Sequence, residues 1–203
     1  EVVVLSEYGI SAVDQPVHLN RVFRARGWLE LKNELGREML ECGACRAFAV
    51  ADHQVAHVYV NDPSIRDEVR AALEETDGVE EVREGGFGDG IGAGRAGDFV
   101  AVAGPGAWFT YYYWNDEAVA PDYARTIDIH RKPGYDPVEL HFNPVTKSIP
   151  LDATLVRGSH GAPVLDDTQR TVMLSSEPGL LPHHTGMRDV DVFGVVLRSE
   201  EHT

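Results

Sequence analysis

The sequence has few cysteines, few basic residues and no long apolar run, and each shortage limits what the protein can be. Only 2 of its 203 residues are cysteines, so nothing in the sequence demands an oxidising compartment. No apolar run approaches the ~20 residues that a membrane-spanning helix needs, and no signal-peptide pattern opens the chain. We therefore expect a soluble, cytoplasmic protein without a membrane partner.

Basic residues are outnumbered by acidic ones. Lys and Arg total 18 against 33 Asp and Glu, which gives a formal net charge of −15 at pH 7. No basic cluster offsets this charge, so duplex nucleic acid is not an expected partner. An acidic protein can still bind a phosphate through a metal ion, and phosphate chemistry therefore stays open.

Two short motifs that often mark a function are incomplete. Cys42 and Cys45 form a single Cys-Gly-Ala-Cys without the second pair that a zinc site of this kind needs. The pair also precedes a strand-like segment, whereas a redox motif follows a strand and opens a helix. We interpret the cysteines as incidental free thiols, with a redox or metal role as the alternative. The glycine-rich residues 85–94 lack the Gly-Lys-Ser/Thr ending of a phosphate-binding loop, so we predict a hairpin loop there.

The apolar segments predict an α/β fold. The run Val2–Leu5 is typical of a strand that is covered on both faces. Residues 47–60 are the most strand-like stretch, and Asp62-Pro63 is a good start for the helix that follows. We divide the chain into a core segment, an inserted α+β subdomain and a return to the core, at residues 1–45, 46–120 and 121–203.

An aromatic run, residues 108–114, holds six aromatic side chains in seven positions. Platforms that stack nucleic-acid bases normally carry basic residues, and these are missing here. We therefore predict that the run packs in the core.

Two segments place a metal-competent side chain beside glycine, where the backbone can turn sharply. One is Ser6-Glu7-Tyr8-Gly9, at the carboxyl end of the first strand, where open α/β sheets place their ligands. The other is Ser159-His160-Gly161. We expect Glu7 and His160 to converge on one site.

A histidine pair and a polar cluster supply further candidates. If residues 53–60 form one strand, His53 and His57 share a face but lie ~13 Å apart, too far for one small ion unless a bulge shortens the distance. Local hydrogen bonding and contact with substrate or metal both stay open for them.

Asp128 and His130 alternate as in a strand, so they face the same way. They would serve either as two ligands of one ion or as a carboxylate that orients a histidine. The neighbouring Arg131 and Lys132 would meet a phosphate oxygen. We therefore expect Arg131 and Lys132, with His53 and His57, to bind substrate.

In their order along the chain, these segments resemble the alkaline phosphatase superfamily, and specifically its bacterial nucleotide pyrophosphatase/phosphodiesterase-like family. The segments that carry the resemblance are residues 6–9, 47–60, 108–114, 128–140 and 159–161. The resemblance implies that the chain is the C-terminal portion of such a protein and forms part of an alkaline-phosphatase-like core sheet. It further implies a metal-dependent hydrolase of phosphodiester or phosphoanhydride bonds that acts on a small phosphate ester.

The resemblance also implies a divalent metal cofactor. One or two ions, usually zinc, with manganese or magnesium as alternatives, would clamp the phosphoryl group and activate a Thr or Ser nucleophile. His160 would be a metal ligand, and Glu7 and Tyr8 stand where the family usually has Asp-His. Tyr is a poor substitute for His at zinc and suits a harder or weaker site. One ion would therefore be lost, displaced, or ligated by Asp128, His130 or His57 instead.

The nucleophile is expected in an N-terminal remainder of the same protein, which would then be a partner of this chain. The alternative is a catalytically inactive family member that acts in ligand binding or assembly, which the tyrosine at position 8 favours.

Overall fold

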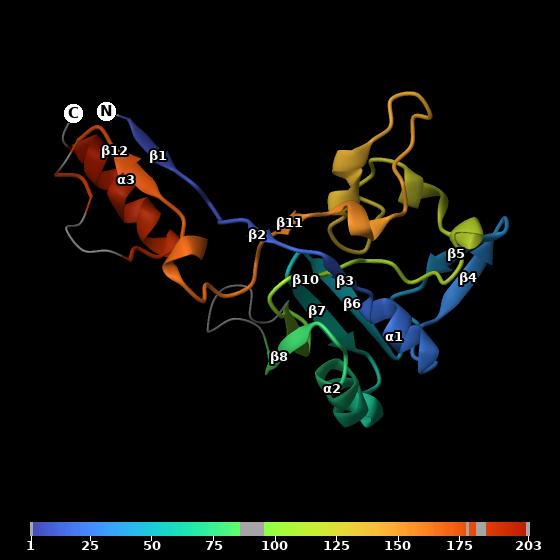
Figure 1. Cartoon of the computed structure of the whole chain (residues 1–203). Coiled ribbons are helices and arrows are strands. Elements are labelled where there is room, and N and C mark those ends of the chain that lie inside the picture. The colour runs from blue at the N-terminus through green and yellow to red at the C-terminus, as the bar shows by residue number, and fades with distance from the viewer. Residues whose placement is uncertain (1, 86–95, 178, 182–185, 202–203) are drawn as a thin grey trace. The chain divides into compact units, whose positions relative to one another are not determined.

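The structure is a computed structural model that describes residues 2–85, 96–177, 179–181 and 186–201. The chain divides into two compact units, which are described separately (Figure 1). Unit 1 combines residues 1–10 with 163–203, and unit 2 comprises residues 11–162. Most of the glycine-rich stretch 85–94 lies outside the described residues, so the predicted hairpin loop there stays a prediction. The expected three-segment division of the chain also stays a prediction.

Unit 2 is built on a four-stranded antiparallel sheet with the strand order β6-β7-β9-β8. Its strands are β6 (Ala47–Asp52), β7 (Val55–Val60), β8 (Val79–Glu84) and β9 (Phe99–Ala103). A helical turn, Pro63–Ile65, leads into α2 (Arg66–Glu74). Asp62 caps this turn because its carboxylate accepts a hydrogen bond from the Ser64 amide. The helix start at Asp62-Pro63 and the strand character of residues 47–60 are therefore confirmed.

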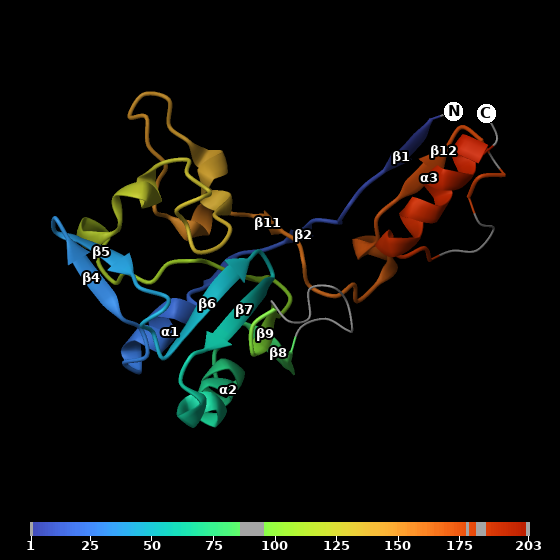
Figure 2. The same ribbon diagram turned by 180° about the vertical axis from the view of Figure 1, so that it is seen from behind.

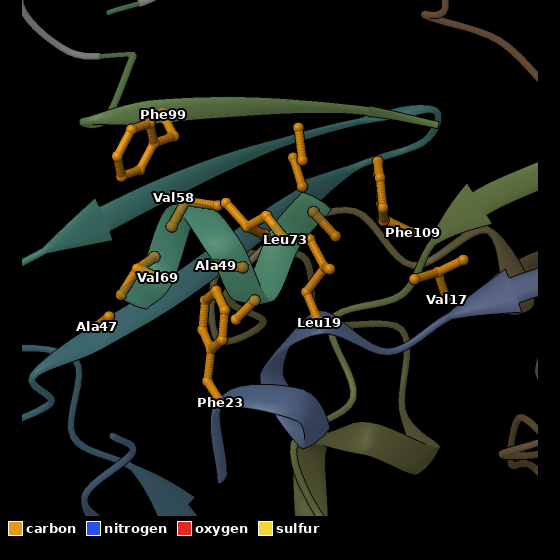
Figure 3. Close-up of a cluster of buried hydrophobic side chains, with 14 of the residues drawn as sticks. Val17, Leu19, Phe23, Ala47, Ala49, Val58, Val69, Leu73, Phe99 and Phe109 are labelled. Carbon is orange, nitrogen blue, oxygen red and sulfur yellow. The ribbon is translucent and has the colours of Figure 1, made fainter. Parts of the chain in front are cut away.

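Helix α2 covers one face of this sheet (Figures 2 and 3). Val69 and Leu73 are fully buried against strand residues such as Val58 and Phe99. Burying one such side chain is worth about 1.5–3 kcal/mol relative to exposure. The opposite face carries a smaller cluster around Val55.

Helix α1 (Leu19–Ala25) packs on the same core and is tied to the sheet by a buried amide. Asn20 Nδ2 donates to the Ala49 carbonyl at 2.8 Å, and its Oδ1 accepts from the Ala49 amide at 2.8 Å. The helical spacing of apolar residues predicts a helix from Pro16 to Arg26, which α1 confirms except for its start. Pro16 instead lies in β3 (Gln15–Val17), which pairs in parallel with β10 (Ala107–Phe109). Proline is tolerated in a two-stranded pairing because each strand has a partner on one side only. The missing amide hydrogen of the proline can then lie on the side without a partner strand.

The aromatic run forms a second core in unit 2. Trp108, Trp114 and the tyrosines at 111–113 are all buried there, which confirms the predicted packing role. The hairpin of β4 (Leu31–Glu34) and β5 (Arg37–Leu40) packs against this core through partly buried side chains. Short helical turns surround it, at Glu117–Val119, Asp122–Arg125, Pro137–His141 and Ala153–Leu155. Strands β2 (Ser11–Ala12) and β11 (Gly158–Ser159) form a small antiparallel pair.

Unit 1 contains a two-stranded antiparallel pairing of β1 (Val3–Leu5) with β12 (Met173–Ser175). It also contains α3 (Val192–Glu201) and turns at Asp167–Gln169 and Asp189–Asp191. The expectation that β1 is covered on both faces is wrong for this structure, because Val4 is 56% and Leu5 44% exposed. A two-stranded ribbon has too few neighbours to bury both faces of a strand.

The class is therefore α/β, with small sheets and few helices among the described residues, and the alkaline-phosphatase core sheet stays a prediction. Within the described ranges, every helix is too short or too polar to cross a bilayer.

Candidate functional site

Three loops of unit 2 meet beside the end of the β6–β7 hairpin. The Gln54 amide donates to the His160 carbonyl at 2.8 Å, which joins the hairpin turn to the loop after β11. The Tyr135 amide donates to the Ala51 carbonyl at 2.8 Å, and Gly134 forms a parallel bridge with Ala51. Backbone hydrogen bonds therefore hold all three loops in a fixed register.

His53 lies at the centre of this arrangement. It is the first residue of the two-residue turn between β6 and β7, since the pairing of these strands closes at Asp52 and Val55. Its φ of 58° is unusual for a residue other than glycine. The His53 ring packs on the ring of His160, with a centroid separation of 4.0 Å, and on that of Tyr135 at 4.8 Å. The condition that residues 53–60 form one strand is not met, because the chain turns at His53 and β7 begins at Val55.

Asp52 holds one edge of the His53 ring. Its Oδ1 lies 2.9 Å from His53 Nδ1, and the two side chains are 49% and 15% exposed respectively. A carboxylate can only accept, so Nδ1 carries the hydrogen and Nε2 of the neutral ring is an acceptor. This bond is the main cause that lowers the pKa of Asp52; burial opposes the shift, and electrostatic interactions with the surrounding histidines act in the same direction as the bond. Asp52 therefore stays ionised beside the histidines.

Glycine permits the close approach of the loop that carries Tyr135. Gly134 has a φ of +130°, and a Cβ there would lie 2.6 Å from the Ala51 carbonyl oxygen. Gly161, which follows His160, has a φ of +106°. The sharp turn that the sequence predicts beside His160 is thus present.

His57 lies on β7, four residues beyond His53. It pairs with Val50 across the hairpin, and its Nδ1 lies 2.8 Å from the Ala96 carbonyl oxygen. It shares the sheet face of Val55, opposite the face that α2 covers. This hydrogen bond joins residues 39 positions apart, and a contact of His57 with substrate or metal stays a prediction.

Asp128 and His130 do not form a strand. His130 lies in an exposed turn, and Asp128 is half-buried in irregular backbone just before it. The Asp128 carbonyl accepts from the Arg131 amide at 3.2 Å, as in a turn. The prediction that alternation along a strand makes these two side chains face the same way is therefore wrong, while their role as ligands stays a prediction.

The two basic candidates differ in burial. Arg131 is exposed, donates to Asp122 at 3.0 Å and lies over the Tyr123 ring. Arg131 is thus accessible to a ligand.

Lys132, in contrast, is buried, with 1% of its side chain exposed. Its ammonium donates to the Thr126 carbonyl and to Asp136, each at 2.8 Å, and to Glu139. Burial raises the pKa of Asp136, and the bond from Lys132 opposes this shift. A phosphate would have to displace one of these bonds to reach Lys132, and its substrate-binding role stays a prediction.

Glu7 and Tyr8 lie in unit 1, and both are exposed. The neighbouring Ser6 amide donates to the Val172 carbonyl at 3.0 Å, and the Val172 amide donates to Ser6 Oγ at 3.1 Å. Their expected convergence with His160, which belongs to unit 2, stays a prediction.

The described residues do not supply a complete set of metal ligands. Within residues 2–85, 96–177, 179–181 and 186–201, no three His, Cys, Asp or Glu side chains are arranged to hold one. Where the three loops meet, the strongest donors are the imidazoles of His53 and His160 and the carboxylate of Asp52. This carboxylate already accepts a hydrogen bond from His53. The described residues of unit 2 therefore do not by themselves supply the three or four protein ligands of a zinc site.

Sequence reasoning missed Asp52 and Tyr135 as members of this site. The signal for Asp52 is the Asp-His dipeptide at the end of an alternating strand, which reads equally well as a strand interruption. Tyr135 follows a Pro-Gly turn, and only the bridge between Gly134 and Ala51 reveals where that turn lies.

The three-loop site, defined by Asp52, His53, Tyr135 and His160, has the residue types of a hydrolase centre. Residues 1–136 match the family model of type I phosphodiesterase / nucleotide pyrophosphatase, within the alkaline phosphatase superfamily. Because this match covers more than half of the chain, the protein belongs to that family, as the sequence resemblance predicts. Its enzymes are phosphoester hydrolases that typically depend on metal ions.

The matched range includes Asp52, His53 and Tyr135 and ends before His160. No curated protein and no solved structure matches the chain.

Proposed function

We propose that this chain forms part of a metal-dependent hydrolase of phosphodiester or phosphoanhydride bonds, with a small phosphate ester as its substrate. The observation that carries the proposal is the packing of His53, held by Asp52, on His160 in a member of this family. Imidazole groups of this kind can accept or donate a proton near neutral pH, which phosphoester hydrolysis requires at the attacking and leaving oxygens.

In this proposal His53 contacts the substrate through the ring edge that Asp52 leaves available. His57, Arg131 and Lys132 are further proposed substrate contacts, of which Arg131 has the most exposed cationic group. An exposed guanidinium can donate two parallel hydrogen bonds to a phosphate. The side chains of this chain thus bind and orient the phosphoryl group.

The proposed metal ligands are His160, Glu7, Tyr8, Asp128 and His130. A bound divalent ion, zinc with manganese or magnesium as alternatives, would neutralise phosphoryl charge. Since the described residues do not gather three donors, further ligands and a Thr or Ser nucleophile are proposed to come from an N-terminal remainder of the same protein.

The binding partner and the cellular location of the protein belong to the same proposal. The net charge of −15 supports a small ester over duplex nucleic acid as the partner, and no membrane partner is proposed. The free thiols of Cys42 and Cys45 support a cytoplasmic location.

Turnover and metal content of the full-length protein test the proposal. We expect hydrolysis of bis(p-nitrophenyl) phosphate, its loss after chelation and its return with zinc or manganese. His160→Ala should lower kcat/KM by more than 100-fold, whereas the matched control His141→Ala, at an exposed position, should not change it. A full-length protein with neither bound metal nor turnover overturns the proposal.

The second candidate is a catalytically inactive member that binds a ligand or assists assembly. Two observations favour it, namely the tyrosine at position 8 and the incomplete donor set among the described residues. This candidate predicts that Glu7→Ala and His160→Ala leave the binding function unchanged. A metal-dependent rate in the wild-type protein would rule it out.

A further inference from the structure

We infer that Asp52 is a positioning residue, which fixes the tautomer and the orientation of His53 so that Nε2 faces the substrate as a hydrogen-bond acceptor. The expected effect on kcat rests on the proposed function. The expected effect on the tautomer and orientation of the His53 ring does not.

The turn between β6 and β7 places the His53 ring beside the rings of His160 and Tyr135. Asp52 is the last residue of β6, and the two-residue loop leaves His53 with a φ of 58°. A residue other than glycine is strained in this region and persists only where its surroundings hold it. Here the His53 carbonyl accepts from the Phe109 amide at 2.7 Å, and the next amide, of Gln54, donates to His160.

Ring contacts then restrict the rotation of the imidazole. His160 and Tyr135 pack on the ring, with planes inclined by 30° and 39°. The carboxylate of Asp52 occupies the Nδ1 edge. Within the described part of the chain, Nε2 makes no hydrogen bond, so it is the edge that is left for a ligand.

The carboxylate decides which nitrogen carries the hydrogen. With Asp52 present, Nδ1 must donate, and Nε2 keeps its lone pair. An asparagine at position 52 can turn its amide and donate to Nδ1, which moves the hydrogen to Nε2. In the Ser-His-Asp triad, the same substitution leaves the geometry intact and lowers kcat by about 10⁴ because the tautomer is wrong.

The experiment compares the full-length wild-type protein with Asp52→Asn, Asp52→Glu and the control Asp67→Asn, which changes an exposed carboxylate in the first turn of α2. Long-range ¹⁵N–¹H correlation spectra report the tautomer of His53, assigned with His53→Gln, at a pH where the ring is neutral. The same spectra show whether each variant is folded.

We expect the Nδ1–H tautomer in the wild type and the Nε2–H tautomer in Asp52→Asn. For bis(p-nitrophenyl) phosphate, kcat should fall at least tenfold while KM changes less than threefold. Asp52→Glu should restore the Nδ1–H tautomer and part of kcat, and Asp67→Asn should match the wild type.

An unchanged tautomer in folded Asp52→Asn, or an unchanged kcat, overturns the inference. If the wild-type protein has no turnover at all, the proposed function fails. The tautomer comparison then still decides whether Asp52 positions His53.

Discussion

The imidazole of His53 packs on the imidazole of His160, with ring centroids 4.0 Å apart and planes inclined by 30°. One ring belongs to the hairpin turn between β6 and β7, and the other follows β11. The backbone bond from the Gln54 amide to the His160 carbonyl joins their loops. Two rings in such contact share their surroundings, so a change in one alters the other.

Substitution of both histidines should therefore be non-additive. We expect His53→Ala and His160→Ala each to lower kcat/KM for a phosphodiester by more than tenfold. The double variant should lose less than the product of the two effects, with a coupling of about 0.5–3 kcal/mol. In the matched cycle, His53→Ala with exposed His141→Ala should be additive within about 0.5 kcal/mol. Additive losses in the first cycle would mean that the two rings act independently.

Gly134→Ala should destabilise the protein by about 1–3 kcal/mol. The positive φ of +130° disfavours a side chain, and the added Cβ would lie 2.6 Å from the Ala51 oxygen and 2.9 Å from its nitrogen. Both neighbours are backbone atoms of a central hairpin, so neither can move cheaply. Urea unfolding measures the loss, with Gly43→Ala as the control because nothing lies within 4 Å of that position. Equal midpoints for the two variants would show that the loop of Tyr135 can shift without cost.

Local patterns predicted the strands within residues 47–60 and the helix that follows Asp62-Pro63, because strand alternation and helix capping depend on neighbouring residues. The cap at Asp62 and the buried aromatic run are examples. The helix predicted from Pro16 to Arg26 is present as α1, but its start is wrong by three residues because Pro16 pairs with β10, which lies far along the sequence. Long-range pairing of this kind overrides local propensity.

The candidate site was predictable only in part. His53 and His160 each stood out by residue type, but their contact depends on a turn at His53 that hydrophobic alternation does not reveal. Asp128 and His130 looked paired because a strand was assumed, and the chain instead turns there. Sequence alone also cannot show that Asp136 and Glu139 surround the ammonium of Lys132, with which a phosphate would have to compete.

Lys132→Met should cost about 3–5 kcal/mol of unfolding free energy at pH 7, because it leaves two carboxylates without their buried partner. Arg131→Met is the matched control, since it removes the exposed pair with Asp122 and the contact with the Tyr123 ring and should cost about 1 kcal/mol. Burial already raises the pKa of Asp136, and loss of Lys132 raises it further. Protonation of Asp136 should therefore shrink the deficit as the pH falls. Similar losses in both variants at pH 7 would refute a buried stabilising role for Lys132.

His18 should make the protein less stable as the pH falls from about 6.5 to about 4. Its Nδ1 lies 2.6 Å from Thr110 Oγ1 and its ring stacks on Tyr112. Burial, with a smaller contribution from the Arg21 charge, lowers its pKa from 6.5 to about 4.

Between these values the unfolded chain binds the proton and the folded chain does not, so acidification favours unfolding. Below about pH 4 both states are protonated and the effect ends. The shift corresponds to at most about 3 kcal/mol.

His18→Asn keeps a hydrogen-bonding group near Thr110 but cannot titrate. The difference in unfolding free energy between the wild type and this variant should therefore fall by up to about 3 kcal/mol as the pH falls from about 6.5 to about 4. Carboxylates that titrate in both proteins cancel in this difference. Exposed His141→Asn should leave the wild-type slope unchanged. A constant difference between the wild type and His18→Asn from pH 7 to pH 4 would show that His18 takes up its proton equally well in the folded protein.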